Sequence, residues 1–382
     1  MFVLVYVDDI IITGDSKEAI DQVIQQLNHK FALKDLGDLH YFLGIQVTKT
    51  DAGGLVLSQE RYVKDLLKKA DIENYKPCHT PLPSSVKLSA FGGSVFHNPK
   101  FYRSVVGSLQ YLTVTRPELS YCVGRLSQFM HTPLDEHWKL VKRVLRYISG
   151  TTSFGLHLHR TSPHNIAAYS DSDWRGDLDD RKSTGGFCVF LGKNLVSWSS
   201  KKQGAVARSS TEAEYRAMAD LVAELIWIKN FMIELRSQLQ ASPLIYCDNL
   251  SVVLLAANPI LHSKSKHFEM DLHFVRDYVT KQAVQVTHVL GTVQLTDVLT
   301  KSLPSTAFLE SRTKLMVEDL EQYKFLSVRF KEEDSKEQVN SKQYEKDETK
   351  NSSNNSRSHN GKITNEQNES VSTKNEVEQQ GS

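Results

Sequence analysis

The sequence predicts an α/β protein, and three observations lead to that class. Between residues 154 and 303, short apolar runs of strand length alternate with longer segments whose apolar residues recur at helical spacing. Residues 1–12 hold two β-branched runs around an acidic pair, which predicts an N-terminal hairpin in a smaller α+β region. After Lys331 the chain becomes rich in Glu, Lys, Asn, Ser and Gln, which predicts a disordered C-terminal tail.

Each element follows from the same patterns. Apolar residues at helical spacing predict helices at 16–30, 59–70, 101–149 (three segments broken near Pro117 and Pro133), 211–235, 250–257 and 268–281, and a terminal helix within 302–327. Short apolar runs predict strands at 42–48, 55–58, 156–159, 165–170, 185–191, 195–199, 244–247 and 284–289.

Composition limits the class of protein further. The chain has 382 residues, of which 40% are hydrophobic, so about two domains with real cores are expected. The net charge is only +1, and the four cysteines are too far apart to predict a zinc knuckle or a disulfide framework. No apolar run reaches transmembrane length, and Asp8 and Asp9 interrupt the first one, which argues against a signal peptide. We therefore expect an intracellular protein of the cytoplasm or nucleus, without a membrane partner.

Acidic residues recur at the ends of the predicted α/β elements. Asp171 ends one apolar strand, Asp248 ends another, Glu214 lies near the start of the long helix, and Asp297 follows the last strand. Burying a carboxylate is costly without a partner, and a hard cation such as Mg²⁺ is the usual partner for oxygen ligands. Four carboxylates at one sheet edge would hold two Mg²⁺ ions, with Mn²⁺ as a substitute, around a phosphodiester.

Five strings in this segment resemble, in order, the ribonuclease H domain of copia-type retrotransposon Pol polyproteins. They are YSDSDW (169–174), STGGF (183–187), VSWSSKKQ (196–203), SSTEAEYRA (209–217) and KHFEMDLHFVR (266–276). The resemblance implies a ribonuclease H-like mixed sheet and an Mg²⁺-dependent ribonuclease that cleaves RNA–DNA hybrids. It also implies that Asp171, Glu214, Asp248 and Asp297 are the catalytic metal ligands.

Two neighbouring acids are alternatives within this set. Asp173 could replace Asp171, which aligns better with the family's strand-end Asp, and Glu212 could replace Glu214, which fits the family's helix pattern. His288 is a further catalytic candidate, for proton transfer or product release, or else an ordinary polar residue at a strand end. The chain departs from the family at Leu290, where Pro is usual, and at Thr296, where Ala is usual.

The N-terminal hairpin resembles the catalytic hairpin of reverse transcriptases at YVDD (6–9). The strings FALKDLG (31–37) and YFLGI (41–45) resemble the segment that follows it in copia-type enzymes. Asp8 and Asp9 are therefore interpreted as a remnant of the polymerase motif. Because the family needs one more Asp on an earlier strand, we expect an RNA-directed DNA polymerase fragment that is inactive alone. A full-length polymerase copy acting in trans is then an expected partner.

These segments give a predicted domain plan. It comprises a partial reverse transcriptase palm and thumb at 1–75, a linker and helical connection at 76–153, the ribonuclease H-like domain at 154–318 and the disordered tail at 331–382.

Several residues are candidates for binding the nucleic acid. A basic stripe on the helix at 134–149 is either a track for the hybrid's phosphates or a solvated face. Strand contacts are expected near the carboxylates, because a hybrid is recognised through its 2′-hydroxyls. The candidates are Lys139, Lys142, Arg143, Arg146, Asn249, Ser172 and Arg175. The alternative function is that of a catalytically inactive nucleic-acid-binding remnant of a degenerate element.

Overall fold

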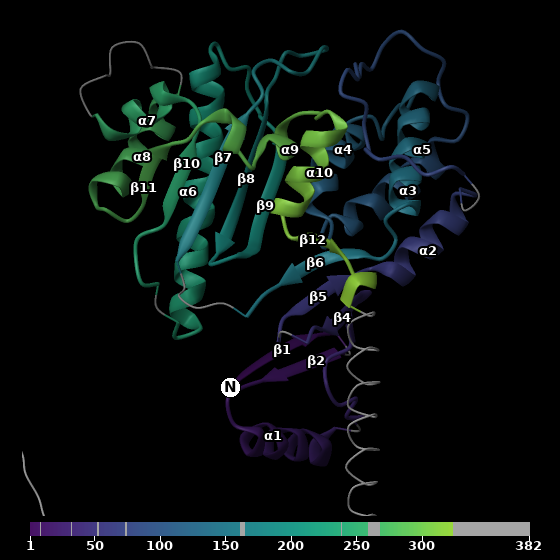
Figure 1. Cartoon of the computed structure of the whole chain (residues 1–382), viewed down its shortest axis with the longest axis vertical. Coiled ribbons are helices and arrows are strands. Elements are labelled where there is room, and N and C mark those ends of the chain that lie inside the picture. The colour runs from purple at the N-terminus through teal and green to yellow at the C-terminus, as the bar shows by residue number, and fades with distance from the viewer. Residues whose placement is uncertain are drawn as a thin grey trace, which may run out of the picture. The chain divides into compact units, whose positions relative to one another are not determined.

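The computed structural model describes residues 1–7, 9–31, 33–51, 53–72, 75–160, 165–237, 239–258 and 268–323 (Figure 1). The chain divides into two compact units, Met1–Leu326 and Ser327–Ser382. The second unit, with the predicted disordered tail, lies outside the described residues, and so does Asp8. The account below concerns the first unit.

A five-stranded mixed sheet lies at the centre of the predicted nuclease segment and confirms the α/β class. Its order is β11-β10-β7-β8-β9. β7 pairs antiparallel with β8 and parallel with β10, and β11 pairs parallel with β10. The strands are β7 (Ile166–Ser172), β8 (Thr184–Leu191), β9 (Asn194–Lys202), β10 (Leu244–Cys247) and β11 (Gln285–His288).

Both faces of this sheet are covered, so β8 is apolar along almost its whole length. Phe187 and Val189 lie in one core cluster with α6 (Ser210–Glu234), α7 (Leu250–Ala257) and α8 (Glu269–Thr280). Cys188 and Phe190, which point to the opposite face, lie in a second cluster. That cluster contains α3 (Pro99–Leu112), α4 (Ser120–Ser127), α5 (Asp135–Ser149) and α9 (Asp297–Thr300). The three-segment helical region predicted at 101–149 is confirmed.

A second, antiparallel sheet joins segments that are far apart in the sequence. Its order is β12-β6-β5-β4-β3. The strands are β3 (Tyr41–Phe42), β4 (Ile45–Lys49), β5 (Leu55–Ser58), β6 (Phe154–Leu158) and β12 (Val317–Asp319). Strands from the predicted first and third domains therefore share one sheet and one core cluster. The domain limits themselves stay a prediction.

Two predicted elements differ from the structure. The strand expected at 42–48 is split, because Leu43 and Gly44 take positive φ angles of 49° and 77° and turn the chain between β3 and β4. The terminal helix expected within 302–327 ends early. After α10 (Ser305–Lys314), Met316 takes a φ of 62° and the chain returns as β12 beside β6.

The N-terminal hairpin forms, with its turn one residue earlier than predicted. In the register of β1 (Phe2–Tyr6) and β2 (Asp9–Thr13), Tyr6 pairs with Asp9, so Asp9 belongs to a strand and not to the turn. Val7 takes a φ of 49°, an uncommon angle for a β-branched residue. The helices α1 (Lys17–Lys30) and α2 (Glu60–Lys69) agree with their predictions.

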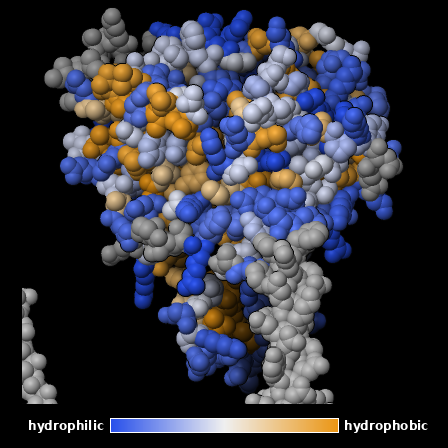
Figure 2. All heavy atoms as spheres, in the orientation of Figure 1, coloured by the Kyte–Doolittle hydropathy of each residue, from blue (hydrophilic) through white to orange (hydrophobic). Residues whose placement is uncertain are grey.

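The surface is mixed in character. Figure 2 shows apolar atoms gathered over the region where Figure 1 places α7 and α8, and Leu250, Leu254 and Met270 of these helices are exposed. Among the described residues, no helix has the length and apolar character needed to cross a membrane.

Candidate active site

The two central parallel strands bring Asp171 and Asp248 to one sheet edge. Tyr169 of β7 pairs with Tyr246 of β10, and the two aspartates lie two residues beyond this pair. Asp171 is buried, with 5% of its surface exposed, whereas Asp248 is half-buried. The parallel register therefore fixes the relative position of these two predicted ligands.

The start of α6 places Glu214 beside the end of β10. Ser209 caps the helix by accepting the backbone N–H of Glu212, so Glu214 lies one turn inside. The Glu214 carboxylate accepts a hydrogen bond from Asn249 Nδ2 at 3.0 Å and one from Cys247 Sγ at 3.6 Å. Ligand atoms of Glu214, Cys247 and Asp248 all lie within 4.8 Å of one another.

The pKa values of Glu214 and Asp297 respond to burial and to the charges of Asp171 and Asp248. The pKa of Glu214 is raised to about 7, first by burial and then by the charges of Asp248 and Asp171, while the hydrogen bond from Asn249 opposes the rise. Burial raises the pKa of Asp297 to about 6, where Lys301 opposes the rise and Asp171 and Asp248 add to it. Asp171 and Asp248 thus interact with both Glu214 and Asp297, and the role of these four residues as metal ligands stays a prediction.

Two residues that the sequence reasoning missed complete this carboxylate group. The hydroxyl of Thr300 donates to Oδ2 of Asp171. The ammonium of Lys301 lies 2.8 Å from Oδ1 of Asp297 and 3.8 Å from Oδ2 of Asp171. Helical spacing in the sequence could have predicted both residues, because positions three and four after Asp297 lie on the same helix face as its side chain.

The two alternative acids have other partners. Asp173 accepts the backbone N–H of Thr184 on β8, and its own N–H donates to the Thr184 carbonyl. Glu212 is 3% exposed, accepts the backbone N–H of Arg208 at 2.9 Å and pairs with Arg216 at 2.8 Å. Glu212 therefore stabilises the start of α6. Because both alternative acids have other partners, Asp171 and Glu214 remain the proposed ligands.

His288 and the two departures from the family pattern lie around this edge. His288 is exposed, and its Nε2 lies 3.1 Å from the backbone oxygen of Asp248. Leu290 has φ −70° and ψ 143°, and its side chain is exposed. The position therefore accommodates leucine in place of the family's usual proline. Thr296 is fully buried, and its hydroxyl lies 3.8 Å from Cys188 Sγ.

Two of the four residues in the predicted basic stripe are bonded to residues outside their own helix. Arg143 donates to the Thr80 hydroxyl at 2.8 Å, and Arg146 donates to the Lys76 carbonyl at 2.7 Å. Lys139 is exposed and pairs with Glu136 on its own helix, and Lys142 is half-buried. The phosphate track stays a prediction, with the two lysines as its freer members.

The three predicted strand contacts differ in accessibility. The hydroxyl of Ser172 is buried between the carbonyls of Asp173 and Thr184. Asn249 uses its oxygen to cap α7 and its nitrogen to hold Glu214. Arg175 is exposed, with its guanidinium 5.8 Å from the ring of Trp174. Arg175 is the candidate whose side chain is freest to reach a ligand.

The donor set of the carboxylate group fits Mg²⁺. Its four carboxylates are hard oxygen ligands, and the pKa values of Glu214 and Asp297 are raised by burial and then by neighbouring negative charges, both of which a bound cation would offset. Burial raises the pKa of the Cys247 thiol, so this neighbour stays protonated and does not add a soft thiolate ligand.

Comparisons with known proteins assign the family. A family model for reverse transcriptase (RNA-dependent DNA polymerase) matches residues 1–84. The chain is 48% identical over 317 residues to the retrovirus-related Pol polyprotein from transposon RE2 of Arabidopsis thaliana. The matched region is 83% of this chain and 22% of that polyprotein. It is 49% identical over 227 residues to the uncharacterized mitochondrial protein AtMg00810 of the same plant, covering 59% of this chain and 94% of that protein. The chain belongs to the copia-type retrotransposon Pol family.

A further relative and two solved structures are also similar to parts of this chain. The Pol polyprotein from tobacco transposon TNT 1-94 is 36% identical over 318 residues, covering 81% of this chain and 24% of that protein. A foamy viral protease–reverse transcriptase in complex with double-stranded DNA is 12% identical, covers 79% of this chain and 46% of that one, and has a TM-score of 0.45. LC11-RNase H1 in complex with an RNA/DNA hybrid is 16% identical and has a TM-score of 0.27. The match covers 34% of this chain and 88% of that chain. The fold assignment rests on the strand order given above.

Proposed function

We propose that this member of the copia-type Pol family is an Mg²⁺-dependent ribonuclease that cleaves the RNA strand of RNA–DNA hybrids. The observation that carries the proposal is the convergence of Asp171, Glu214, Asp248 and Asp297: besides burial, the charges of Asp171 and Asp248 raise the pKa values of both Glu214 and Asp297. Family membership supports the substrate class, because a retrotransposon Pol protein acts on both RNA and DNA.

Three of the four carboxylates have a neighbouring contact that positions them. Thr300 donates to Asp171, Asn249 donates to Glu214, and the parallel pairing of β10 with β7 sets Asp248 beside Asp171. A bound pair of Mg²⁺ ions would supply an activated water and a stabilised leaving 3′ oxygen. His288, whose Nε2 lies 3.1 Å from the backbone oxygen of Asp248, would receive or deliver a proton at the edge of the site.

A cleavage assay with a labelled hybrid in Mg²⁺ tests the proposal. The chain should cut the RNA strand of the hybrid and leave single-stranded RNA intact. Asp248→Asn should lower the rate by at least about 100-fold, because losing a metal ligand costs more than losing a group that only supports one. Asp277→Asn is the matched control, since Asp277 is an exposed carboxylate on α8 paired with Lys281.

The opposite result would favour a binding protein without catalysis. That outcome is retention of the hybrid in a mobility-shift gel with no cleavage in either Mg²⁺ or Mn²⁺. The contact of Lys301 with Asp171 and Asp297 makes this a concrete alternative, because an ammonium group already offsets part of the negative charge there.

A further inference from the structure

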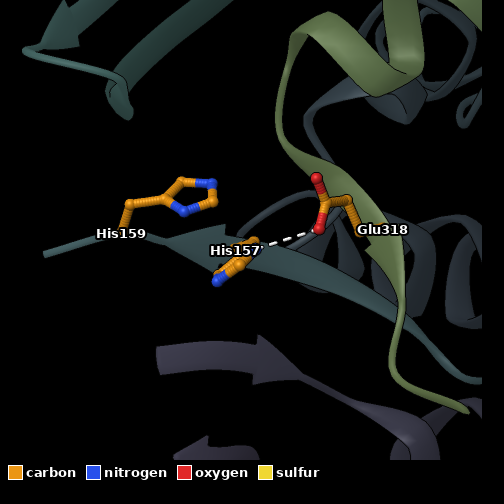
Figure 3. A group of neighbouring side chains, drawn as sticks. All are labelled: His157, His159 and Glu318. Atoms are coloured by element: carbon orange, nitrogen blue, oxygen red, sulfur yellow. Dashed lines mark hydrogen bonds and ion pairs between the residues drawn. The ribbon is translucent and has the colours of Figure 1, made fainter. Parts of the chain in front are cut away.

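A second group of metal-binding side chains shares no residue with the carboxylate group. His157 lies in β6, His159 directly follows the end of this strand, and Glu318 lies in the neighbouring strand β12. Residues two positions apart along a strand point to the same face. Figure 3 shows the His157 imidazole joined to the Glu318 carboxylate, with the His159 imidazole beside them. One ligand atom from each of the three lies within 4.8 Å of the others.

The strand register explains why Glu318 reaches His157. Glu318 pairs with Gly155 on β6, so His157 is its diagonal neighbour on the same face. Gly155 places no side chain between them, and an added Cβ there would lie only 2.5 Å from the Leu57 carbonyl oxygen. As a result Nδ1 of His157 lies 2.9 Å from Oε2 of Glu318.

Nδ1 is the nitrogen of His157 that faces His159 and Glu318. Its Nε2 is buried without a hydrogen-bond partner among the described residues, and a Cβ on Gly54 would lie 3.0 Å from it. The Tyr323 hydroxyl lies 2.8 Å from Nδ1 and also hydrogen bonds to the Glu318 carboxylate. A nitrogen and two oxygens therefore converge on one point, and the ring of His159 lies 3.8 Å from that of His157.

We propose that His157, His159 and Glu318 bind a transition-metal ion of the Zn²⁺ class at the junction of β6 and β12. Two imidazole nitrogens and one carboxylate oxygen form a donor set that suits Zn²⁺. The four-carboxylate group differs, because its oxygen ligands suit Mg²⁺. The Tyr323 hydroxyl or a water would complete the coordination. The bound ion would cross-link β12, near the end of the described chain, to β6 and so stabilise the second sheet.

Calorimetric titration of the full chain with Zn²⁺, in excess Mg²⁺ to occupy the carboxylate group, tests the proposal. The wild-type protein should bind one Zn²⁺ more tightly than His159→Ala by at least about tenfold. This variant should fold normally, because His159 is joined to Asn194 through its backbone N–H and carbonyl, which alanine keeps. Glu318→Gln should weaken binding similarly, since a neutral amide is a poorer ligand than a carboxylate.

Two further measurements distinguish a built site from surface histidines. Co²⁺ in place of Zn²⁺ should give the visible absorption of a four-coordinate ion in the wild type and lose it in His159→Ala. His273→Ala, which removes an exposed imidazole on α8, should bind Zn²⁺ like the wild type. Equal Zn²⁺ affinity in the wild type and His159→Ala would overturn the proposal. His157 and Glu318 would then form only a hydrogen bond between two strands.

Discussion

The ammonium nitrogen of Lys301 lies 2.8 Å from Oδ1 of Asp297, one helical turn earlier in the chain. The same ammonium lies 3.8 Å from Asp171, so it stands between two of the predicted metal ligands. Lys301 is 45% exposed and its pKa is raised, in spite of partial burial, by the charges of Asp171 and Asp297. A fixed positive charge therefore occupies part of the space that a cation would use.

Replacing Lys301 by methionine should strengthen Mg²⁺ binding. Methionine keeps most of the side-chain length but removes the charge that repels the ion. We expect the Mg²⁺ concentration at half-saturation to fall about fivefold, which corresponds to roughly 1 kcal/mol of relieved repulsion. Lys281→Met is the matched control, because Lys281 pairs with Asp277 at the same spacing and at 2.7 Å. Weaker Mg²⁺ binding in Lys301→Met would show that the ammonium organises the carboxylates instead.

The stability of the metal-free protein should fall as the pH rises toward 7. The pKa of Glu214 is about 7 in the folded chain, above its ordinary value of 4.5. A carboxyl group with a raised pKa favours the folded state when protonated, so its contribution is complete below pH 4.5 and is lost as the pH passes 7.

Thermal melts in EDTA at about pH 5 and about pH 8 measure this loss. Glu214→Gln should remove about 1 to 2 kcal/mol of the pH-dependent difference in unfolding free energy, after allowance for solvent screening. Added Mg²⁺ should restore the stability of the wild type at the higher pH, because it binds the ionised carboxylates. An unchanged pH profile in Glu214→Gln would show that other groups cause the dependence.

The two glutamates of the Glu-Ala-Glu segment should separate structure from metal binding. Glu212 is buried, caps the start of α6 and pairs with Arg216, so Glu212→Ala should cost about 1 to 3 kcal/mol of unfolding free energy. Glu214→Ala should cost less, because it also removes like-charge repulsion, but it should weaken Mg²⁺ binding strongly. Urea unfolding and Mg²⁺ calorimetry on both variants check this. The reverse pattern would identify Glu212 as the ligand.

The sequence predicted the elements of the nuclease segment because their signals are local. The strand at 244–247 and the helix at 250–257 agree with the structure residue for residue, since an apolar run, an acidic stop and an Asn cap mark their ends. The convergence of Asp171 with Asp248 was predictable once both were recognised as strand ends. β12 could not be predicted, because its pairing with β6 depends on a partner about 160 residues away and on the positive φ of Met316.

Long-range contacts also explain the partners that the sequence did not predict. Arg143 and Arg146 lie on the polar face of an amphipathic helix, where the pattern cannot distinguish a solvated arginine from one that holds a distant loop. The structure shows both guanidinium groups bonded to residues 76–80. Likewise, the roles of Thr300 and Lys301 depend on Asp171, which comes from a different element.

The members of the basic stripe should therefore divide into two functional classes. Lys139→Gln together with Lys142→Gln should weaken hybrid binding and lower the slope of log affinity against log salt by about two units, without changing stability. Arg143→Gln together with Arg146→Gln should instead lower the melting temperature, because two bonds to residues 76–80 are lost. Filter binding at several salt concentrations and thermal melts measure both effects. An unchanged salt slope in the lysine variant would remove α5 from the nucleic-acid interface.

Leu290→Pro should stabilise the protein without disturbing the carboxylate group. Leu290 already has a φ of −70°, which is the angle that a proline ring imposes, and its side chain is exposed. Its carbonyl accepts the N–H of Val293, a bond that proline keeps because only the nitrogen changes. Proline restricts the unfolded chain, so we expect urea unfolding to show a gain of about 0.4 to 1 kcal/mol in the free energy of unfolding.

The Mg²⁺ affinity of Leu290→Pro should stay at the wild-type level, because the backbone path from His288 to Asp297 is kept. A loss of stability would mean that the Leu290 N–H has a partner that matters, and a change in Mg²⁺ affinity would mean that this turn helps to set the position of Asp297.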